Sequence, residues 1–313
     1  MLSVVIVTWN AKKYVRECLQ SLVDQAEGFA LEIIVVDNAS SDGTPELVLQ
    51  EFPQARLVRN SQNLGFAKGN NIGMNLSHGE YIALINSDVN VRPGCLRKML
   101  DFLQQNPSVG MLGPRMLTPN GGVGRSYMRF PSIWNWLCRA MALDSLCGGS
   151  RWFGGFLMTD FDNSKTADVD VLNGWFWMIR RSALLQVGPL DEGFFMYGED
   201  IEWCQRFHQS GWRVVYFPEA EALHYGGASS SAAPVRFSIE MQRANLRYYA
   251  KTHPGRMQQF AFWFLTSLHH CIRLAGYSLL FLLDRSRRSE AAFKMERSKS
   301  CLQWLMGIRT TSH

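Results

Sequence analysis

The chain has 313 residues, of which 47% are hydrophobic and 19% are charged. This composition is typical of a globular protein with a core of useful size, and no low-complexity block predicts disorder. The seven cysteines are scattered, with no C-x-x-C pair and none at zinc-ligand spacing with a histidine. They argue against a zinc site and favour reduced, partly buried thiols.

The formal net charge of +5 hides an asymmetry along the chain. Residues 1–235 carry 19 Lys and Arg against 23 Asp and Glu, whereas residues 236–313 carry 13 against 4. This difference predicts a larger domain over 1–235 followed by a basic tail over 236–313. A tail with such an excess of positive charge is expected to have an anionic partner.

Strand and helix patterns alternate over residues 1–120. Short apolar runs predict strands at 3–8, 33–37, 55–60, 81–88 and about 109–117. Helical spacing, with a Thr-Pro start at residue 44, predicts helices at about 14–23, 44–52, 66–77 and 93–105. Continuous apolar strands separated by helices are typical of an α/β fold whose parallel sheet is covered on both faces.

The pattern is less regular in the middle of the chain. Aromatic residues crowd segment 121–165, which fits either a flexible binding loop or an aromatic satellite core. These residues are Trp134, Trp136, Trp152, Phe153 and Phe156. Order then returns, and the sequence predicts a strand and a helix over 169–188, a helix within 195–211, a strand over 212–218 and a loop over 224–233.

The tail combines apolar and basic character. Residues 237–253 predict a polar helix, and residues 260–283 are mostly apolar but interrupted by His269, His270 and Arg273. The uninterrupted apolar runs fall short of the ~20 residues that a bilayer span needs. Basic residues follow the segment, so we expect it to lie on an anionic membrane surface. A tilted span and a helical hairpin buried against the core are the alternatives.

Polar residues follow three of the predicted strands. They are Thr8-Trp9-Asn10, Asp37-Asn38-Ala39-Ser40 and Asn86-Ser87-Asp88. Ligands bind at the carboxyl ends of parallel strands, so Asp37 either accepts hydrogen bonds from a ligand there or only braces the next turn. Asp88, beside Asn86, either offers oxygens to a hard cation such as Mg²⁺ or only caps a loop.

A second acidic pair, Glu199-Asp200, opens a predicted helix. One alternative is a structural role, because the helix dipole favours carboxylates there, and the other is that of a general base. His224 is a candidate metal ligand or phosphate contact, or else structural. Arg236 either clamps phosphate oxygens or belongs to a solvated basic face.

Six segments, in order, resemble the motif series of the family 2 inverting glycosyltransferases with a GT-A fold. More narrowly, they resemble the bacterial rhamnosyltransferase-like branch. The segments are SVVIVTWN, VVDNASSDGT, NLGFAKGNNIG, ALINSDV, NGWFWMIRR and FMYGEDIEWCQR. The resemblance spans roughly residues 2–250, and six motifs in the right order are far more specific than one.

The resemblance implies an α/β, Rossmann-like GT-A fold with a mixed, mostly parallel sheet flanked by helices. Residues 1–120 would form the nucleotide-sugar half and residues 121–235 the acceptor half, followed by a helical, membrane-associating tail. The implied reaction moves a sugar, rhamnose from dTDP-rhamnose by branch resemblance, to a hydroxyl of a polyprenyl-diphosphate-linked saccharide. Such an enzyme of cell-surface polysaccharide synthesis would be cytoplasmic and peripheral on the inner face of the cytoplasmic membrane.

The resemblance also implies residue roles. Asp200 matches the catalytic base, with Glu199 as its neighbour. Asp88 matches the last acid of the DxD metal motif, whose first acid is here Asn86, and His224 would complete a site for Mg²⁺ or Mn²⁺. Together with Arg236, the residues expected to bind the nucleotide sugar are Thr8, Trp9, Asn10, Asp37, Asn63, Gly65, Asn70, Asn86 and Asp88.

The implied mechanism is a single displacement that inverts the anomeric configuration, with loop 225–235 closing over the donor. The main alternatives are transfer directly to polyprenyl phosphate and a non-catalytic sugar- or membrane-binding partner with the same fold. A nucleotidyltransferase is disfavoured because the first turn lacks a glycine-rich phosphate loop. A dehydrogenase is disfavoured because no G-x-G-x-x-G follows the first strand. The basic residues follow no groove pattern, so no nucleic-acid partner is expected.

Overall fold

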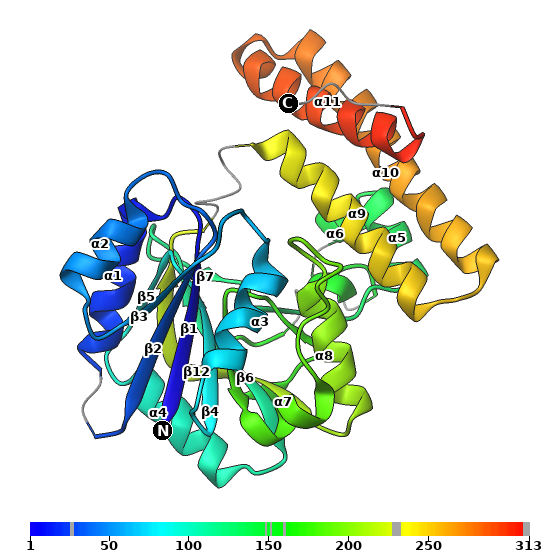
Figure 1. Ribbon diagram of the computed structural model, residues 1–313. Helices are drawn as coiled ribbons and strands as arrows, with labels where there is room; N and C mark the ends of the chain where they lie inside the picture. The colour runs from blue at the N-terminus through cyan, green and yellow to red at the C-terminus, as the bar shows by residue number, and fades with distance from the viewer. Residues whose placement is uncertain (26–27, 148, 151, 159–160, 227–232, 309–313) are drawn as a thin grey trace. The chain divides into compact units, whose positions relative to one another are not determined.

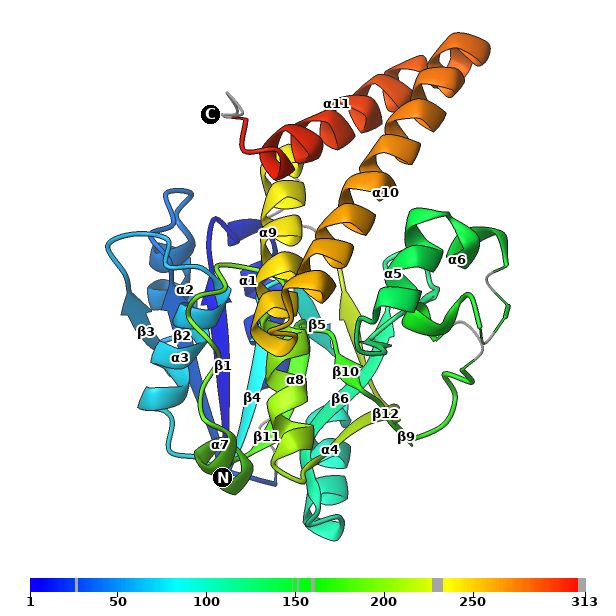
Figure 2. The ribbon, with the colours of Figure 1, turned by 90° about the vertical axis from the view of Figure 1, so that its right-hand side faces the viewer.

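The computed structural model describes residues 1–25, 28–147, 149–150, 152–158, 161–226 and 233–308. The chain forms two compact units, drawn in Figure 1 and Figure 2. The first comprises Met1–Met128 and Asp162–Ser229, and the second comprises Arg129–Phe161 and Ser230–His313. Each unit is described by itself.

The first unit is built on a ten-stranded mixed sheet with the order β3-β2-β1-β4-β11-β6-β12-β5, in which β7 pairs with β6 and β9 with β12. A separate pair is formed by β8 and β10. The strands are β1 (Leu2–Thr8), β2 (Leu31–Asp37), β3 (Arg56–Arg59), β4 (Tyr81–Asn86), β5 (Val89–Val91), β6 (Val109–Leu117), β7 (Val123–Gly124), β8 (Tyr127–Met128), β9 (Ala167–Asp168), β10 (Val171–Leu172), β11 (Phe176–Arg180) and β12 (Arg213–His224).

The strands β3, β2, β1 and β4 are all parallel, and β12 is parallel to β6. The predicted parallel sheet is therefore confirmed for the first half of the unit. It is wrong for β11, which lies antiparallel between β4 and β6. The result is the mixed, mostly parallel sheet that the resemblance implied.

Helices cover both faces of this sheet (Figure 1). They are α1 (Lys12–Val23), α2 (Thr44–Glu51), α3 (Phe66–Leu76), α4 (Cys95–Gln105), α7 (Arg181–Val187) and α8 (Glu199–Gln209). Apolar residues of α1, α2 and α4 share one buried cluster with Leu2, Val4 and Ile6 of β1. Alternate residues of a strand point to opposite faces, so Val5 and Val7 face the other layer, where α3 packs.

Two glycines let α3 approach β1 closely. A Cβ placed on Gly73 would lie 2.2 Å from a methyl carbon of Val5, and one on Gly69 would lie 2.9 Å from a methyl carbon of Val7. Asn71 of the same helix fixes a distant loop, because its side chain donates to the carbonyl oxygen of Leu190 at 2.9 Å and accepts from the Leu190 N–H at 3.0 Å. Helix α3 therefore packs closely on β1 and also fixes the loop that contains Leu190.

The second unit is helical. Its elements are α5 (Ile133–Ala140), α6 (Leu143–Leu146), the 3-10 turn η1 (Gly155–Leu157), α9 (Pro234–Thr252), α10 (Arg256–Leu283), the 3-10 turn η2 (Arg285–Arg287) and α11 (Arg288–Leu305). Trp136 stacks on Phe262 with 4.8 Å between ring centroids, and its indole N–H donates to Thr266 at 2.9 Å. Of the two interpretations of the aromatic middle segment, the satellite core is observed around Trp136, whereas Trp134 and Trp152 are exposed.

Some expectations differ from the observed elements. His224 is the last residue of β12 instead of the first of a loop, and residues 227–232 of the predicted donor-closing loop lie outside the described residues. The short strand β5, directly after Asp88, was not predicted because three residues carry too little periodicity. All seven cysteines lie within the described residues and are free. In the described part of the chain, we find no helix with both the length and the apolar character to cross a bilayer.

The close packing of α3 on β1 can be tested with Gly73→Ala. Although alanine is the better helix former by about 1 kcal/mol, overpacking against Val5 costs about 1–3 kcal/mol. We therefore expect a lower melting temperature in calorimetry. The control is Asn75→Ala, an exposed position of the same helix, where we expect no loss. A Gly73→Ala protein as stable as the parent would contradict the observed packing.

Candidate active site

The carboxyl ends of β1 and β2 meet at Asp37. This side chain is buried, and its two oxygens accept hydrogen bonds from the Thr8 hydroxyl at 2.9 Å and from the Ser40 N–H at 3.0 Å. Asp37 therefore does brace the turn after β2, as one interpretation required. A carboxylate has about four acceptor positions, so this bracing leaves Asp37 able to accept further bonds from a ligand.

The turns after β1 and β2 are bound to each other. Asn10, exposed and with a positive φ of 51°, donates its N–H to the Ser40 hydroxyl at 2.8 Å and accepts from the Ser41 N–H at 2.9 Å. Trp9, beside it, is half-buried. Asparagine tolerates the left-handed region better than most residues. The segment Thr8–Asn10 thus lies at the sheet edge, next to Asp37.

The loop before α3 adjoins the same edge. The Asn63 side chain accepts from the Gly65 N–H at 2.9 Å, and the Gly65 carbonyl accepts from Asn38, the residue after Asp37, at 3.0 Å. Asn70 is buried and donates to its own helix at Phe66. The structure accounts for Asn63 and Asn70 by local bonds. Their role toward a nucleotide stays a prediction.

Asp88 and His224 come together from distant parts of the chain. Asp88 lies between β4 and β5, and β12 pairs antiparallel with β5 so that His224 lies opposite Val89. His224 Nε2 is 3.2 Å from Asp88 Oδ1, and both side chains are largely buried, with 15% and 8% of their surface exposed. The Tyr225 N–H also donates to the Asp88 carbonyl at 3.0 Å.

This pair brings together two of the predicted metal ligands. Within the described residues, no group of three or more His, Cys, Asp or Glu side chains is arranged to hold a metal ion. Asp88 and His224 nevertheless bring a carboxylate oxygen and an imidazole nitrogen within 3.2 Å of each other, and Asn86, half-buried at the end of β4, lies two residues before Asp88. Mg²⁺ often uses only one or two carboxylates, with the rest supplied by phosphates and water. The residues present therefore fit a cation shared with a diphosphate ligand.

The acidic pair Glu199-Asp200 begins α8 after a left-handed turn. Tyr197 and Gly198 both have positive φ, 69° and 77°; such a conformation is strained for tyrosine and is typical of functional sites. Asp200 Oδ1 accepts from the Ile201 N–H at 2.9 Å. The turn therefore places a buried carboxyl group, that of Glu199, directly before a partly buried one, that of Asp200.

Burial governs the protonation of this pair. It raises the pKa of Glu199 well above the ordinary range, and the neighbouring Asp200 raises it further. Glu199 Oε2 is buried without a hydrogen-bond partner among the described residues. Burial also raises the pKa of Asp200, although backbone N–H groups counter it. The environments thus favour a neutral Glu199 beside a carboxylate at Asp200, since two adjacent buried charges are costly.

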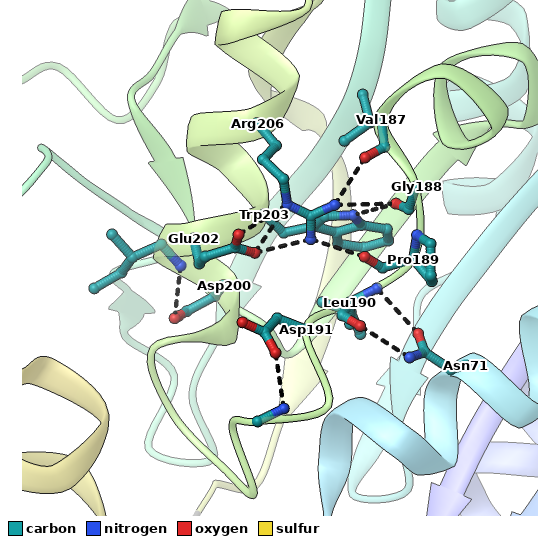
Figure 3. A network of polar contacts seen from close by, with 12 residues as sticks. Asn71, Val187, Gly188, Pro189, Leu190, Asp191, Asp200, Glu202, Trp203 and Arg206 are labelled. Atoms are coloured by element: carbon teal, nitrogen blue, oxygen red, sulfur yellow. Dashed lines mark hydrogen bonds and ion pairs between the residues drawn. The ribbon is translucent and has the colours of Figure 1, made fainter. Parts of the chain in front are cut away.

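Figure 3 shows the network that fixes α8 behind these acids. The Arg206 guanidinium donates to the carbonyls of Val187 at 2.8 Å and Pro189 at 2.7 Å and forms an ion pair with Glu202 at 2.8 Å. The Trp203 indole N–H donates to the Gly188 carbonyl at 2.9 Å. Asn71 of α3 donates to the carbonyl of Leu190, the residue after Pro189. The helix that carries Asp200 is therefore anchored to α3 and to the segment after α7.

The turn Asn173–Trp175 connects the two acidic sites, although the sequence did not predict it to be part of either. A backbone hydrogen bond from Gly174 stabilises the Asp200 carboxylate. The Trp175 carbonyl accepts from the Asn86 N–H at 3.0 Å, and the Trp175 ring stacks on His224 with centroids 5.4 Å apart. The signal in the sequence was the polar Asn-Gly just before a strongly apolar strand.

Arg236 is the predicted site residue that belongs to the second unit. It lies in the first turn of α9 and is exposed. This helix belongs to the second unit, so the contact of Arg236 with a nucleotide stays a prediction. All the other predicted site residues lie in the first unit, at the ends of β1, β2, β4 and β12 or at the adjoining starts of α3 and α8.

Known proteins resemble this chain over most of its length. It is 30% identical over 302 residues to the N-acetylglucosaminyl-diphospho-decaprenol L-rhamnosyltransferase of Mycobacterium tuberculosis, covering 92% of this chain and 95% of that protein. It is also 27% identical over 228 residues to a low-salt glycan biosynthesis hexosyltransferase of Haloferax volcanii, covering 71% of this chain and 66% of that one.

Solved structures share the fold. A mannosyltransferase of Pyrobaculum calidifontis, in complex with GDP-Man and Mn²⁺, superposes with a TM-score of 0.58 at 15% identity, over 97% of this chain and 87% of that one. S. aureus TarS 1–349 gives 0.51 at 14% identity, over 99% and 93%. The family model described as glycosyl transferase family 2 matches residues 3–188. This chain is therefore a glycosyltransferase that belongs to glycosyl transferase family 2.

Proposed function

We propose that the protein is an inverting rhamnosyltransferase that moves a sugar from dTDP-rhamnose to a hydroxyl of a polyprenyl-diphosphate-linked saccharide in cell-surface polysaccharide synthesis. The observation that carries this proposal is the likeness to the mycobacterial L-rhamnosyltransferase. That protein's name specifies an acceptor on decaprenyl diphosphate, and the likeness covers 95% of its length. Such coverage includes the helical second unit as well as the sheet.

The base in this proposal is Asp200. Its carboxylate would take the proton of the acceptor hydroxyl as that oxygen attacks the anomeric carbon from the face opposite the leaving diphosphate. Burial makes Asp200 a stronger base than an ordinary aspartate, because it raises its pKa. A protonated Glu199 would leave Asp200 the charged member of the pair. The N–H of Gly174 orients it.

A divalent cation, Mg²⁺ or Mn²⁺, would be held by Asp88 and His224 with Asn86 beside them. When bound, it would supply charge neutralisation for the departing nucleoside diphosphate. Two solved structures with this fold, GalNAc-T7 and the Pyrobaculum mannosyltransferase, contain Mn²⁺. On the protein side, Asp37 and Thr8–Asn10 would contact the nucleotide, and stacking on Trp175 would fix the His224 ring.

The acceptor class suggests a membrane-facing surface, and α10 offers one. Large apolar side chains are exposed along this helix and recur at helical spacing on one face. They are Met257, Phe260, Phe264, Ile272, Leu279, Leu282 and Leu283. Exposed Arg256 and Arg285 flank this α10 face. Apolar side chains beside cations match the surface of an anionic membrane. We therefore propose a peripheral location on the inner face of the cytoplasmic membrane.

The proposed base can be tested by donor turnover. Purified protein is incubated with dTDP-, UDP- and GDP-sugars, a polyprenyl-diphosphate-sugar extract and Mg²⁺, Mn²⁺ or EDTA, and nucleoside diphosphate release is measured. We expect Asp200→Asn to lose about 10²–10⁴-fold in rate. The Asp88→Ala variant should need about 10–100-fold more metal to reach half of its maximal rate of release. Glu199→Gln mimics a neutral carboxyl, so it should retain most activity. If Asp200→Asn is as active as the parent, Asp200 is not the base.

The pH profile gives a separate test. Only the ionised Asp200 can accept a proton, so kcat/KM should rise with pH through the pKa of Asp200. Because burial raises this pKa, the midpoint of the acidic limb should lie above the ordinary aspartate value of about 3.9. Glu199→Gln should leave the midpoint nearly unchanged, since a protonated Glu199 contributes no charge. A large downward shift in that variant would mean that Glu199 is ionised in the parent.

Membrane binding can be tested by vesicle flotation. We expect the full-length protein to float with vesicles that contain phosphatidylglycerol, and less with purely zwitterionic ones. Leu279→Gln/Leu282→Gln should reduce flotation several-fold, because each fully transferred leucine contributes about 1.5–3 kcal/mol. The matched control is Leu185→Gln, which changes a leucine of α7 that is 77% exposed. Equal flotation of the double variant and the parent would mean that α10 is not part of the membrane-binding surface.

A further inference from the structure

Three arginines, from three helices of the second unit, lie close enough to His269 for their charges to lower its pKa, and we call these groups the cluster. Arg139 comes from α5, Arg273 from α10 and Arg297 from α11, and the packing of α10 against α5 and α11 is visible in Figure 2. Two histidines of α10, His269 and His270, lie among them with ring centroids 5.1 Å apart. His269 Nδ1 is 3.3 Å from the Arg139 carbonyl oxygen.

The cluster holds more positive charge than its carboxylates balance. Arg139 is 3.7 Å from Asp144, which is buried. Arg273 and Arg297 are both half-buried, and among the described residues neither forms an ion pair. Within the part of the chain that the structure describes, the hydrogen-bond partner of the Arg273 guanidinium is the Tyr277 hydroxyl, at 3.4 Å. Partly buried cations without a counter-charge are costly, so such a cluster is typical of a site whose anion is a ligand.

Burial and the charge of the arginines lower the pKa of both histidines. Burial, together with the charges of Arg139, Arg273 and Arg297, lowers the pKa of His269 to about 4. His270, with a pKa also lowered to about 4, is 7% exposed, and its Nε2 atom is buried with no hydrogen-bond partner in the described structure. A buried polar atom without a partner is rare in proteins and calls for an explanation. A ligand oxygen would provide one.

We propose that Arg139, Arg273, Arg297 and His270 form a binding site for a diphosphate group carried on a prenyl chain. Three guanidiniums offer paired N–H donors from three helices, more than a single phosphate requires. The exposed apolar α10 face belongs to the same helix as Arg273 and His270, so a prenyl chain and its diphosphate would both contact α10. Assigning this diphosphate to the acceptor rests on the proposed function, while the anion site rests on the cluster itself.

The test is calorimetric titration of the full-length protein with farnesyl diphosphate and with inorganic pyrophosphate, both in EDTA so that no divalent cation can hold a diphosphate in the donor site. Loss of charge-assisted bonds should weaken binding about tenfold or more for each arginine removed, measured in Arg273→Gln/Arg297→Gln. The control Arg256→Gln/Arg285→Gln removes the same charge from exposed positions and should bind within about twofold of the parent. His270→Phe keeps the ring shape and should also weaken binding.

The arms separate the possible outcomes. Tighter binding of farnesyl diphosphate than pyrophosphate would identify a prenyl-linked ligand, and equal binding would identify a free diphosphate and overturn the prenyl part. Binding that survives in Arg273→Gln/Arg297→Gln, or none in the parent, overturns the site. The variant Arg273→Lys/Arg297→Lys keeps both charges and should bind at an intermediate affinity. Its melting temperature, compared with that of the parent, controls for misfolding. Metal-dependent release of nucleoside diphosphate from the donor, run in parallel, reports on the proposed function separately.

Discussion

The antiparallel pairing of β11 with β4 is the constraint on which the active-site geometry depends. Its register sets Phe176 opposite Ile85, so the turn Asn173–Trp175 is held against the carboxyl end of β4. From there this turn reaches both acidic sites, bonding to Asn86 and Asp200 and stacking on His224. An all-parallel sheet would have put the start of this strand at the opposite edge, away from every ligand-binding turn.

The three acidic positions of the site differ in how the fold uses them. Asp37 is occupied by protein donors and mainly holds two turns together. Asp88 has an imidazole as its neighbour and is suited to share a cation. In the Glu199-Asp200 pair, Glu199 is buried and Asp200 is partly buried, and burial raises the pKa of both carboxyls although backbone N–H groups counter this at Asp200. The same functional group thus has three different surroundings in this fold, and these surroundings set which chemistry each carboxyl can support.

Elements with a strong local pattern could be predicted well from the sequence. The boundaries of β6 agree to the residue, and those of β1, β2, α3 and β4 agree within two residues, because long apolar periodic runs identify buried elements. The meeting of Asp88 with His224 depends on the pairing of β12 with β5, a short strand with no periodic signal of its own. Pairings between distant segments are set by tertiary packing, and no local pattern encodes them.

The protonation state of Glu199 could not be predicted from the sequence either. Its position at a helix start suggested a carboxylate favoured by the helix dipole, whereas burial and the adjacent Asp200 oppose its ionisation. The surroundings of the two histidines in α10 could not be predicted from the sequence either. The histidines interrupt an apolar run in the sequence, but only the packing of α5 and α11 against them reveals that they lie among arginines. Both cases turn on burial, which is a property of the folded chain.

Gly65 links the two sides of the active site in a way that limits how the protein can be redesigned. Its φ of 84° excludes most other residues, and a Cβ there would lie 2.4 Å from the Phe195 carbonyl oxygen. That carbonyl accepts from the Phe66 N–H at 2.7 Å, and α8 begins four residues after Phe195. A chimaera that takes the loop before α3 from one relative and the G-E-D turn from another would therefore have to match both surfaces at this contact, so the two segments are best exchanged together.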